Sequence, residues 1–197
     1  MKYYKFLSPG GIATNGNGYH WPLPTKNEVG TWVPGKWTRK ISGDLQVCRR
    51  GYHYTDAEFV SGWIDAELYE IEIQGNTVIS EDAPRKYACK KARLLRRIEA
   101  WDEKTARLFA VKCAIDALSR IANPDPRSIN ACDVADRYAE GQATRDELAA
   151  ARAAAGAAAW DAAGAAAGDA ALDAAWDAAR EKQVIQLIDM IRNTNDE

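Results

Sequence analysis

One stretch of the sequence, Cys48 to Asp56, gathers the side chains best suited to bind a polar, planar ligand. It reads CRRGYHYTD and holds two arginines, two tyrosines and one of the chain's two histidines. Guanidinium groups form paired hydrogen bonds with phosphate and stack on bases, which makes Arg49 and Arg50 candidate phosphate ligands. The alternative is an exposed loop whose arginines contact only solvent. Three side chains that could stack on or hydrogen-bond to the rest of a ligand follow: Tyr52, His53 and Tyr54.

The same stretch offers limited means for catalysis. His53 could serve as a general base that Asp56 or Glu58 orients, although a lone histidine among aromatic residues is more often structural. The sequence has no nucleophile elbow, no Gly-Lys-Ser/Thr and no Gly-x-Gly-x-x-Gly between a strand and a helix. We therefore favour a binding protein over an enzyme.

The cysteines do not indicate a metal site. They are far apart and none belongs to a Cys-x-x-Cys pair, and with two histidines they show no zinc spacing. We expect neither a metal nor a cofactor, and reduced, partly buried thiols in a cytoplasmic protein. The four positions are Cys48, Cys89, Cys113 and Cys132.

Length and charge narrow the classes of partner. A chain of 197 residues can form one domain or two small ones, and it has no run of about 18 apolar residues that would span a membrane. Residues 1–101 carry 15 Lys/Arg and 11 Asp/Glu, whereas residues 102–197 carry 11 and 17. A duplex nucleic acid partner is not expected, because such proteins are usually more basic. A basic N-terminal part favours a small anion.

The first 80 residues are expected to form a small antiparallel β-rich ligand-binding domain. Residues 2–7 read as a strand that carries Lys5, and 67–73 alternate cleanly between two faces. Asn15-Gly16-Asn17-Gly18 indicates a turn. The proline-rich segment 19–37 holds tryptophans that either cap the β core or offer stacking faces to a base, among them Trp21 and Trp37.

Residues 81–143 are expected to be a helical region packed on this domain. An amphipathic helix is predicted over 85–101, with a basic stripe that is either a solvated face or one wall of a cleft. Further helices are predicted after Asp102, after Asp125-Pro126, and after a capping box at Thr144–Glu147. The stripe consists of Lys86, Lys90, Arg93 and Arg97, and the last three are candidate ligand-binding residues.

Residues 144–197 are expected to be an alanine-rich helical tail for packing and oligomerisation. Between Leu148 and Ala179, 20 of 32 residues are alanine, which has the highest helix propensity. Trp160 and Trp176 recur with glycines at a spacing of four, so they would point to nearly opposite sides of one long helix. The fold class as a whole is α+β.

Two resemblances add to these predictions. A β-rich N-terminal part with CRRGYH, a strand LYEIEIQG and an alanine-rich tail with WDAA units resembles uncharacterised proteins of phage and prophage genomes. That resemblance implies an accessory role, for example against host defence. The segment RGYHYTD is similar to the nicotinamide-stacking segment of the ADP-ribosyltransferase fold, with Tyr54 or Tyr52 as the stacking ring. Lys5 stands where that fold carries a His or Arg, and Glu70 or Glu72 is available as its glutamate.

Three functions are consistent with the sequence. The first is a phage-type accessory protein that binds and sequesters a phosphorylated nucleotide, such as a host immune signal, without turnover. The second is an ADP-ribosyltransferase-like enzyme that uses NAD. The third is a protein-binding module that acts through the helical tail.

Overall fold

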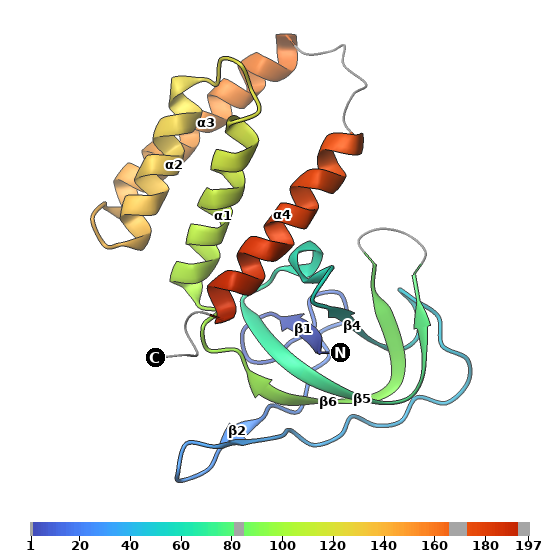
Figure 1. Ribbon diagram of the computed structural model, residues 1–197. Helices are drawn as coiled ribbons and strands as arrows, with labels where there is room; N and C mark the ends of the chain where they lie inside the picture. The colour runs from blue at the N-terminus through green and yellow to red at the C-terminus, as the bar shows by residue number, and fades with distance from the viewer. Residues whose placement is uncertain (1, 81–84, 166–172, 193–197) are drawn as a thin grey trace. The chain divides into compact units, whose positions relative to one another are not determined.

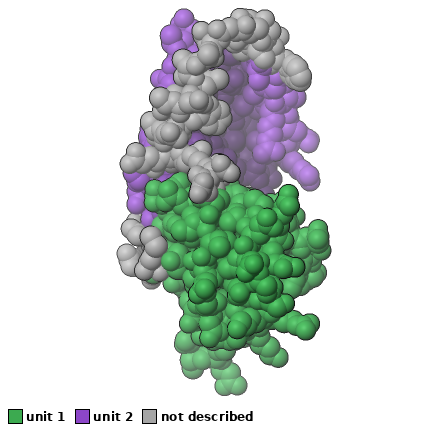
Figure 2. Space-filling view, turned by 90° about the vertical axis from the view of Figure 1, so that its right-hand side faces the viewer, with its two compact units in different colours: residues 1–102, 191–197 green, residues 103–190 purple. Residues whose placement is uncertain are grey.

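The computed structural model describes residues 2–80, 85–165 and 173–192 (Figure 1). The chain divides into two compact units, one formed by residues 1–102 with 191–197 and the other by 103–190 (Figure 2). The first unit holds the β strands and the second is helical. The α+β class expected from the sequence is therefore confirmed.

The first unit is built on a small closed antiparallel barrel. Its strands follow the order β1-β4-β6-β5, and a separate two-stranded sheet pairs β2 with β3. Closing the sheet leaves few unpaired backbone groups at its edges. The barrel strands are β1 (Tyr3–Leu7), β4 (Tyr52–Asp56), β5 (Glu67–Ile79) and β6 (Tyr87–Arg97), the other two are β2 (Thr25–Lys26) and β3 (Trp32–Val33), and the 3₁₀ helix η1 spans Val60–Trp63.

Strand β6 pairs with β5 along the whole of one edge. Two other segments share its second edge, and the first of them is β4, which pairs with Tyr87 to Cys89. Beyond Cys89 the edge is covered by the irregular segment 35–41. Three backbone amides of this segment donate hydrogen bonds of 2.9 Å to carbonyls of β6: Gly35 to Leu94, Thr38 to Ala92, and Ile41 to Lys90. This segment is thereby fixed beside the barrel.

The barrel core is aromatic as well as aliphatic. The rings of Tyr54 and Tyr87 stack with centroids 5.2 Å apart, and Tyr3 meets Tyr54 edge-on at 5.0 Å. Leu7, Cys89 and Leu94 are fully buried in the same cluster. Strand β1, predicted over residues 2–7, and strand β5, predicted over 67–73, are both confirmed, although β5 runs on to Ile79.

The helix predicted over 85–101 is wrong, because these residues contain strand β6. Basic residues at spacings of three and four suggested a helical face, but in β6 the half-buried Lys91 and Arg93 alternate with Ala92 and Leu94, which enter the core. A register shift between Glu70 and Ile71 disturbs that alternation. The acidic strand β5 supplies the partners: Arg93 pairs with Glu72, Arg96 with Glu70 and Arg97 with Glu67. Helical structure begins at Glu103, not near residue 81.

The second unit contains the helices that the sequence indicated most clearly. Asp125 caps α2 by accepting from the Arg127 amide, with Pro126 in the first turn. The capping box is confirmed, because the Thr144 amide donates to Glu147 Oε2 at 2.7 Å and the Glu147 amide donates to Thr144 Oγ1 at 3.2 Å. The helices are α1 (Glu103–Leu118), α2 (Pro126–Ala139), α3 (Arg145–Ala165) and α4 (Asp173–Arg192).

The alanine-rich segment extends over parts of α3 and α4. Whether it forms one continuous helix depends on residues 166–172, which lie outside the described structure. The predicted directions of the Trp160 and Trp176 side chains likewise lie outside it. Leu187, Ile188 and Ile191 of α4 are buried. Within the described residues, no helix combines the length and apolar character needed to cross a membrane.

Candidate functional site: a cation-lined pocket in the barrel unit

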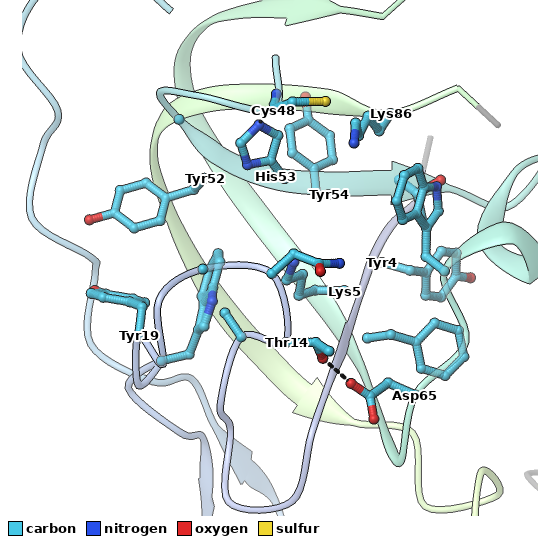
Figure 3. Close-up of a pocket in the computed structure, with 18 of the residues that line it drawn as sticks. Tyr4, Lys5, Thr14, Tyr19, Cys48, Tyr52, His53, Tyr54, Asp65 and Lys86 are labelled. Atoms are coloured by element: carbon cyan, nitrogen blue, oxygen red, sulfur yellow. Dashed lines mark hydrogen bonds between the residues drawn. The ribbon is translucent and has the colours of Figure 1, made fainter. Parts of the chain in front are cut away.

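A pocket of about 990 Å³ opens in the first unit, and six segments of the chain line it. These are β1, the loop from residue 13 to Trp21, Ile41 in the segment beside β6, the segment from Cys48 through β4, the chain around η1, and Lys86 just before β6. Figure 3 shows Lys5 in the middle of the pocket, with His53, Tyr54 and Lys86 on one side and Asp65 on the other. The volume is in the range of small-molecule sites.

Two lysines supply positive charge to the pocket. Lys5 comes from β1 and Lys86 from the residue before β6, and both are half-buried. Burial, together with the charge of Lys86, lowers the pKa of Lys5 to about 8, although Asp65 acts in the opposite direction. Within the described chain neither lysine forms an ion pair with a carboxylate. Their ammonium groups lie near aromatic rings instead, at 5.9 Å from the centroid of Trp21 for Lys5 and 4.4 Å from that of Trp63 for Lys86.

His53 is held as a neutral hydrogen-bond donor to the pocket. Its Nε2 accepts a hydrogen bond of 2.9 Å from the backbone N–H of Cys48, which assigns the ring proton to Nδ1 in the neutral form. Burial lowers the pKa of His53 to about 4, with the nearby charges of Lys5 and Lys86 acting in the same direction. At neutral pH the imidazole therefore adds a hydrogen-bond donor but no charge.

A tight loop brings the Arg49–Arg50 pair to the pocket. The amide of Arg50 donates to the Gln46 carbonyl at 2.7 Å, and the Gln46 amide donates back to the Arg50 carbonyl at 2.9 Å. Cys48 adopts a positive φ of 66° and Gly51 one of 146°. A Cβ on Gly51 would stand 2.7 Å from the Cβ of Ala88, so glycine allows the loop to approach β6 closely.

Asp65 is the carboxylate at the other side of the pocket, and hydroxyl groups already satisfy it. It accepts hydrogen bonds from Ser8 Oγ at 2.8 Å and from Thr14 Oγ1. Although burial opposes its ionisation, the hydrogen bonds from Thr14, the Ala66 amide and Ser8 hold the pKa of Asp65 below its ordinary value. The charge of Asp65 acts on Lys5 at a distance, but its hydrogen bonds go to neutral donors and it forms no ion pair with either lysine.

Aromatic rings form the remaining wall. Tyr52 lies 5.7 Å from Tyr19 and 5.4 Å from Trp21, measured between ring centroids, and its hydroxyl donates to the Arg39 carbonyl at 2.9 Å. Trp21 is only 4% exposed. Its role is thus to support Tyr52 and Lys5, while the exposed Tyr19 and half-buried Tyr52 are the rings that a planar ligand can reach.

The structure brings together some of the residues predicted from the sequence and separates the others. Trp37 lies near Lys91 and Arg93, with the cations 5.1 and 4.7 Å from its ring centroid, and it does not line the pocket. Arg93 and Arg97 are engaged by Glu72 and Glu67 on β5, and Lys90 is likewise absent from the pocket wall. The predicted residues that do line it are Lys5, Trp21, Arg49, Arg50, Tyr52, His53 and Tyr54.

Several lining residues are not predicted from the sequence as part of a site. The sequence pattern places Lys86 on a helical stripe and indicates only a plain turn for the glycine-containing loop 13–19, although this loop carries Thr14 and Tyr19 into the pocket. Trp63 and Asp65 come from the chain at the end of η1, a stretch without a binding motif in the sequence. A local pattern could not have found them, because they meet the Cys48–Asp56 stretch only through barrel closure.

The described residues include no group of three or more His, Cys, Asp or Glu side chains arranged to hold a metal ion. Comparison of the chain with protein-family models, with curated proteins and with solved structures finds no match. The function must therefore be argued from the chemistry of the pocket.

Proposed function

We propose that the barrel pocket binds a phosphorylated nucleotide and holds it without turnover. The observation that carries this proposal is that Lys5 and Lys86 face one cavity and form no ion pair with a carboxylate anywhere in the described chain. A phosphate group would supply the missing negative charge in a partly desolvated site, where charge-assisted hydrogen bonds are strong.

The remaining groups on the pocket wall suit the other parts of a nucleotide. Tyr19 and Tyr52 offer ring surface to a base, and stacking on an aromatic side chain stabilises a bound base by about 1–3 kcal/mol. His53 can donate from Nδ1, and Arg49 and Arg50 add guanidinium groups on the loop. Almost all of these groups are donors or cations, so the ligand should be rich in acceptors.

The biological setting of this proposal comes from the resemblance to phage accessory proteins. A phage protein that sequesters a nucleotide would remove a signal on which host defence depends. Sequestration needs affinity and a protected site, and it needs no catalytic group. The ADP-ribosyltransferase-like enzyme is the competing proposal, because it would use Tyr52 and the same pocket to bind NAD.

A thermal-shift scan tests the proposal directly. The panel consists of NAD, ADP-ribose, nucleoside monophosphates, and cyclic mono-, di- and trinucleotides. A ligand present at 100 times its Kd should stabilise the protein by about 2.7 kcal/mol. The double substitution Lys5→Gln with Lys86→Gln should abolish the shift, whereas Lys2→Gln with Lys36→Gln should retain it, since Lys2 and Lys36 are exposed and do not line the barrel pocket.

The fate of the bound ligand separates binding from catalysis. After denaturation, a sequestering protein returns the nucleotide intact, and its amount matches the number of sites. An enzyme would instead consume NAD, release nicotinamide or label a target protein with ADP-ribose. Failure of every nucleotide to shift the melting temperature would refute the proposal.

We also propose that the alanine-rich segment forms a long helix that mediates self-association. Alanine side chains allow helices to approach closely, and Ala153 and Ala157 lie on α3, one turn apart. Sedimentation velocity on the full chain tests this idea. Ala153→Glu with Ala157→Glu should convert an oligomer to a monomer; a wild-type chain that is already monomeric at micromolar concentration would refute it.

A further inference from the structure

A second, shallower cavity adjoins the barrel pocket. It has a volume of about 470 Å³ and shares three wall residues, Ile41, Arg50 and Tyr52, with the first pocket. Its other lining residues come from the segment beside β6 and are Arg39, Lys40 and Ser42. The two cavities are therefore neighbours on one surface of the first unit, with Arg50 and Tyr52 between them.

The second cavity is also lined by cations. Arg39, Lys40 and Arg50 are all exposed, and none of the three makes an ion pair with any side chain that the structure describes. The carboxylate nearest in sequence, Asp44, lines neither cavity. Three positive groups around a small hollow repel one another, and an anion with several oxygen acceptors would relieve that repulsion.

The backbone around this cavity is held in place before any ligand binds. The Ile41 amide donates to the Lys90 carbonyl at 2.9 Å, and the Tyr52 hydroxyl donates to the Arg39 carbonyl at 2.9 Å. The guanidinium of Arg50 passes close to Gly43, where a Cβ would stand 2.8 Å from Nη1. Binding would therefore require little further ordering of the backbone, which favours affinity.

We infer that the second cavity binds a second phosphate of the same ligand, so that the ligand is a phosphodiester-linked dinucleotide. This inference rests on the proposed function. Lys5 and Lys86 would hold one phosphate, Arg39 and Lys40 the other, and Arg50 can reach either. A diphosphate group has its two phosphorus atoms adjacent and fits one cavity, whereas a dinucleotide that is 5′-phosphorylated or cyclic carries phosphates on both sides of a nucleoside.

Isothermal titration with three probes tests the inference. The probes are AMP, ADP and the 5′-phosphorylated linear dinucleotide pApA, and the guanine series is titrated in parallel. We expect pApA or its guanine counterpart to bind at least tenfold more tightly than the corresponding mono- and diphosphate. In Arg39→Ala with Lys40→Ala, dinucleotide affinity should fall to that of the monophosphate, and monophosphate affinity should stay unchanged.

The control variant is Lys2→Ala with Lys36→Ala, which removes the same charge from exposed positions that line neither cavity. It should bind every probe as the wild type does. If the double change at Arg39 and Lys40 weakens dinucleotide binding no more than this control, long-range charge accounts for the effect and the inference is wrong.

The remaining outcomes separate this inference from the proposal beneath it. Equal affinity for monophosphate and dinucleotide would overturn the second phosphate site and leave nucleotide binding intact. Equal affinity for ADP and pApA would overturn the dinucleotide class. Affinity that keeps rising for pApApA and longer strands would assign the surface to single-stranded nucleic acid. No binding by any probe would refute the proposed function itself.

Discussion

The backbone N–H of Cys48 donates a hydrogen bond of 2.9 Å to Nε2 of His53, five residues further along the chain. This bond links the Arg49–Arg50 loop to the strand that forms the pocket wall. It can exist only while Nε2 carries no proton. The shape of the loop and the protonation state of His53 are therefore coupled.

Acid should destabilise the protein through His53. Its pKa is about 4 in the folded protein and near 6.5 when unfolded, so between these values the unfolded chain binds more protons. The free energy of unfolding should fall as pH drops from 6.5 toward 4, by about 1–2 kcal/mol between pH 7 and pH 5. Urea unfolding of wild type and His53→Gln measures this.

The glutamine variant should lose that part of the pH dependence, because its side chain can accept the Cys48 hydrogen bond without titrating. His20→Gln is the matched control, since His20 is the other histidine and is exposed. An identical pH profile for wild type and His53→Gln would show that His53 does not report on loop closure.

The buried carboxylate of Asp56 accepts hydrogen bonds from the backbone amides of Glu58 and Phe59 at Oδ1 and from one tyrosine hydroxyl at Oδ2. Tyr87 donates to Asp56 Oδ2 at 2.5 Å, and Asp56 is only 2% exposed. We expect Tyr87→Phe to cost about 1.5–3 kcal/mol, because it removes a hydrogen bond to a buried charge. Tyr3→Phe is the control: its ring lies in the same cluster, 6.0 Å from that of Tyr87. Equal melting temperatures for the two variants would contradict this role.

The sequence predicted best where a local rule decides the structure. The capping box at Thr144 and the proline after Asp125 each depend on neighbours within three residues. Strand β5 alternates cleanly in ELYEIEI, so its period was visible without knowledge of its partner. Local rules of this kind operate at helix ends and in regular strands whatever the rest of the fold does.

Prediction from the sequence failed where pairing between strands that are distant in the sequence determines the structure. Strand β6 has the composition of a basic amphipathic helix, and its β conformation follows from pairing with β5, which sets Arg93 opposite Glu72. The Arg49–Tyr54 segment locates the candidate site. The pattern of residues 85–101, however, wrongly places Lys86, the second lysine of the site, in a helix. Trp37 and Arg93 looked equally suitable for a ligand and instead contact each other.

Gly51 should be required for the shape of the pocket. Its φ is 146°, and a methyl group added there would place its carbon 2.7 Å from the Cβ of Ala88, so Gly51→Ala meets both backbone strain and a steric clash. We expect a loss of about 1–3 kcal/mol in unfolding free energy. Gly75 also has a positive φ, but there is open space around a methyl group added there. Gly75→Ala should therefore lower the free energy of unfolding by less than Gly51→Ala does. Urea unfolding of both variants measures the difference, and a larger loss at Gly75 would exclude the clash.

The positive charge of Lys5 should lower the stability of the ligand-free protein and raise its affinity for the ligand. Its pKa of about 8 lies below the ordinary value of 10.5, so the charged form is disfavoured in the fold. Between pH 8 and 10.5 the unfolded chain binds more protons, and this group therefore makes stability rise with pH over that window. Lys5→Met should stabilise the ligand-free protein at pH 7 by about 1–3 kcal/mol, because it removes a desolvated charge.

Binding should respond in the opposite sense. Nucleotide affinity of the wild type should fall as pH rises from 7 to 9, since the protonated amine is the form that attracts phosphate, and it should be lost in Lys5→Met. Chemical denaturation and titration calorimetry on the same samples measure both effects, with Lys2→Met as the exposed control. A variant that is less stable than wild type and still binds nucleotide would show that Lys5 is a structural residue of the barrel and not part of a ligand site.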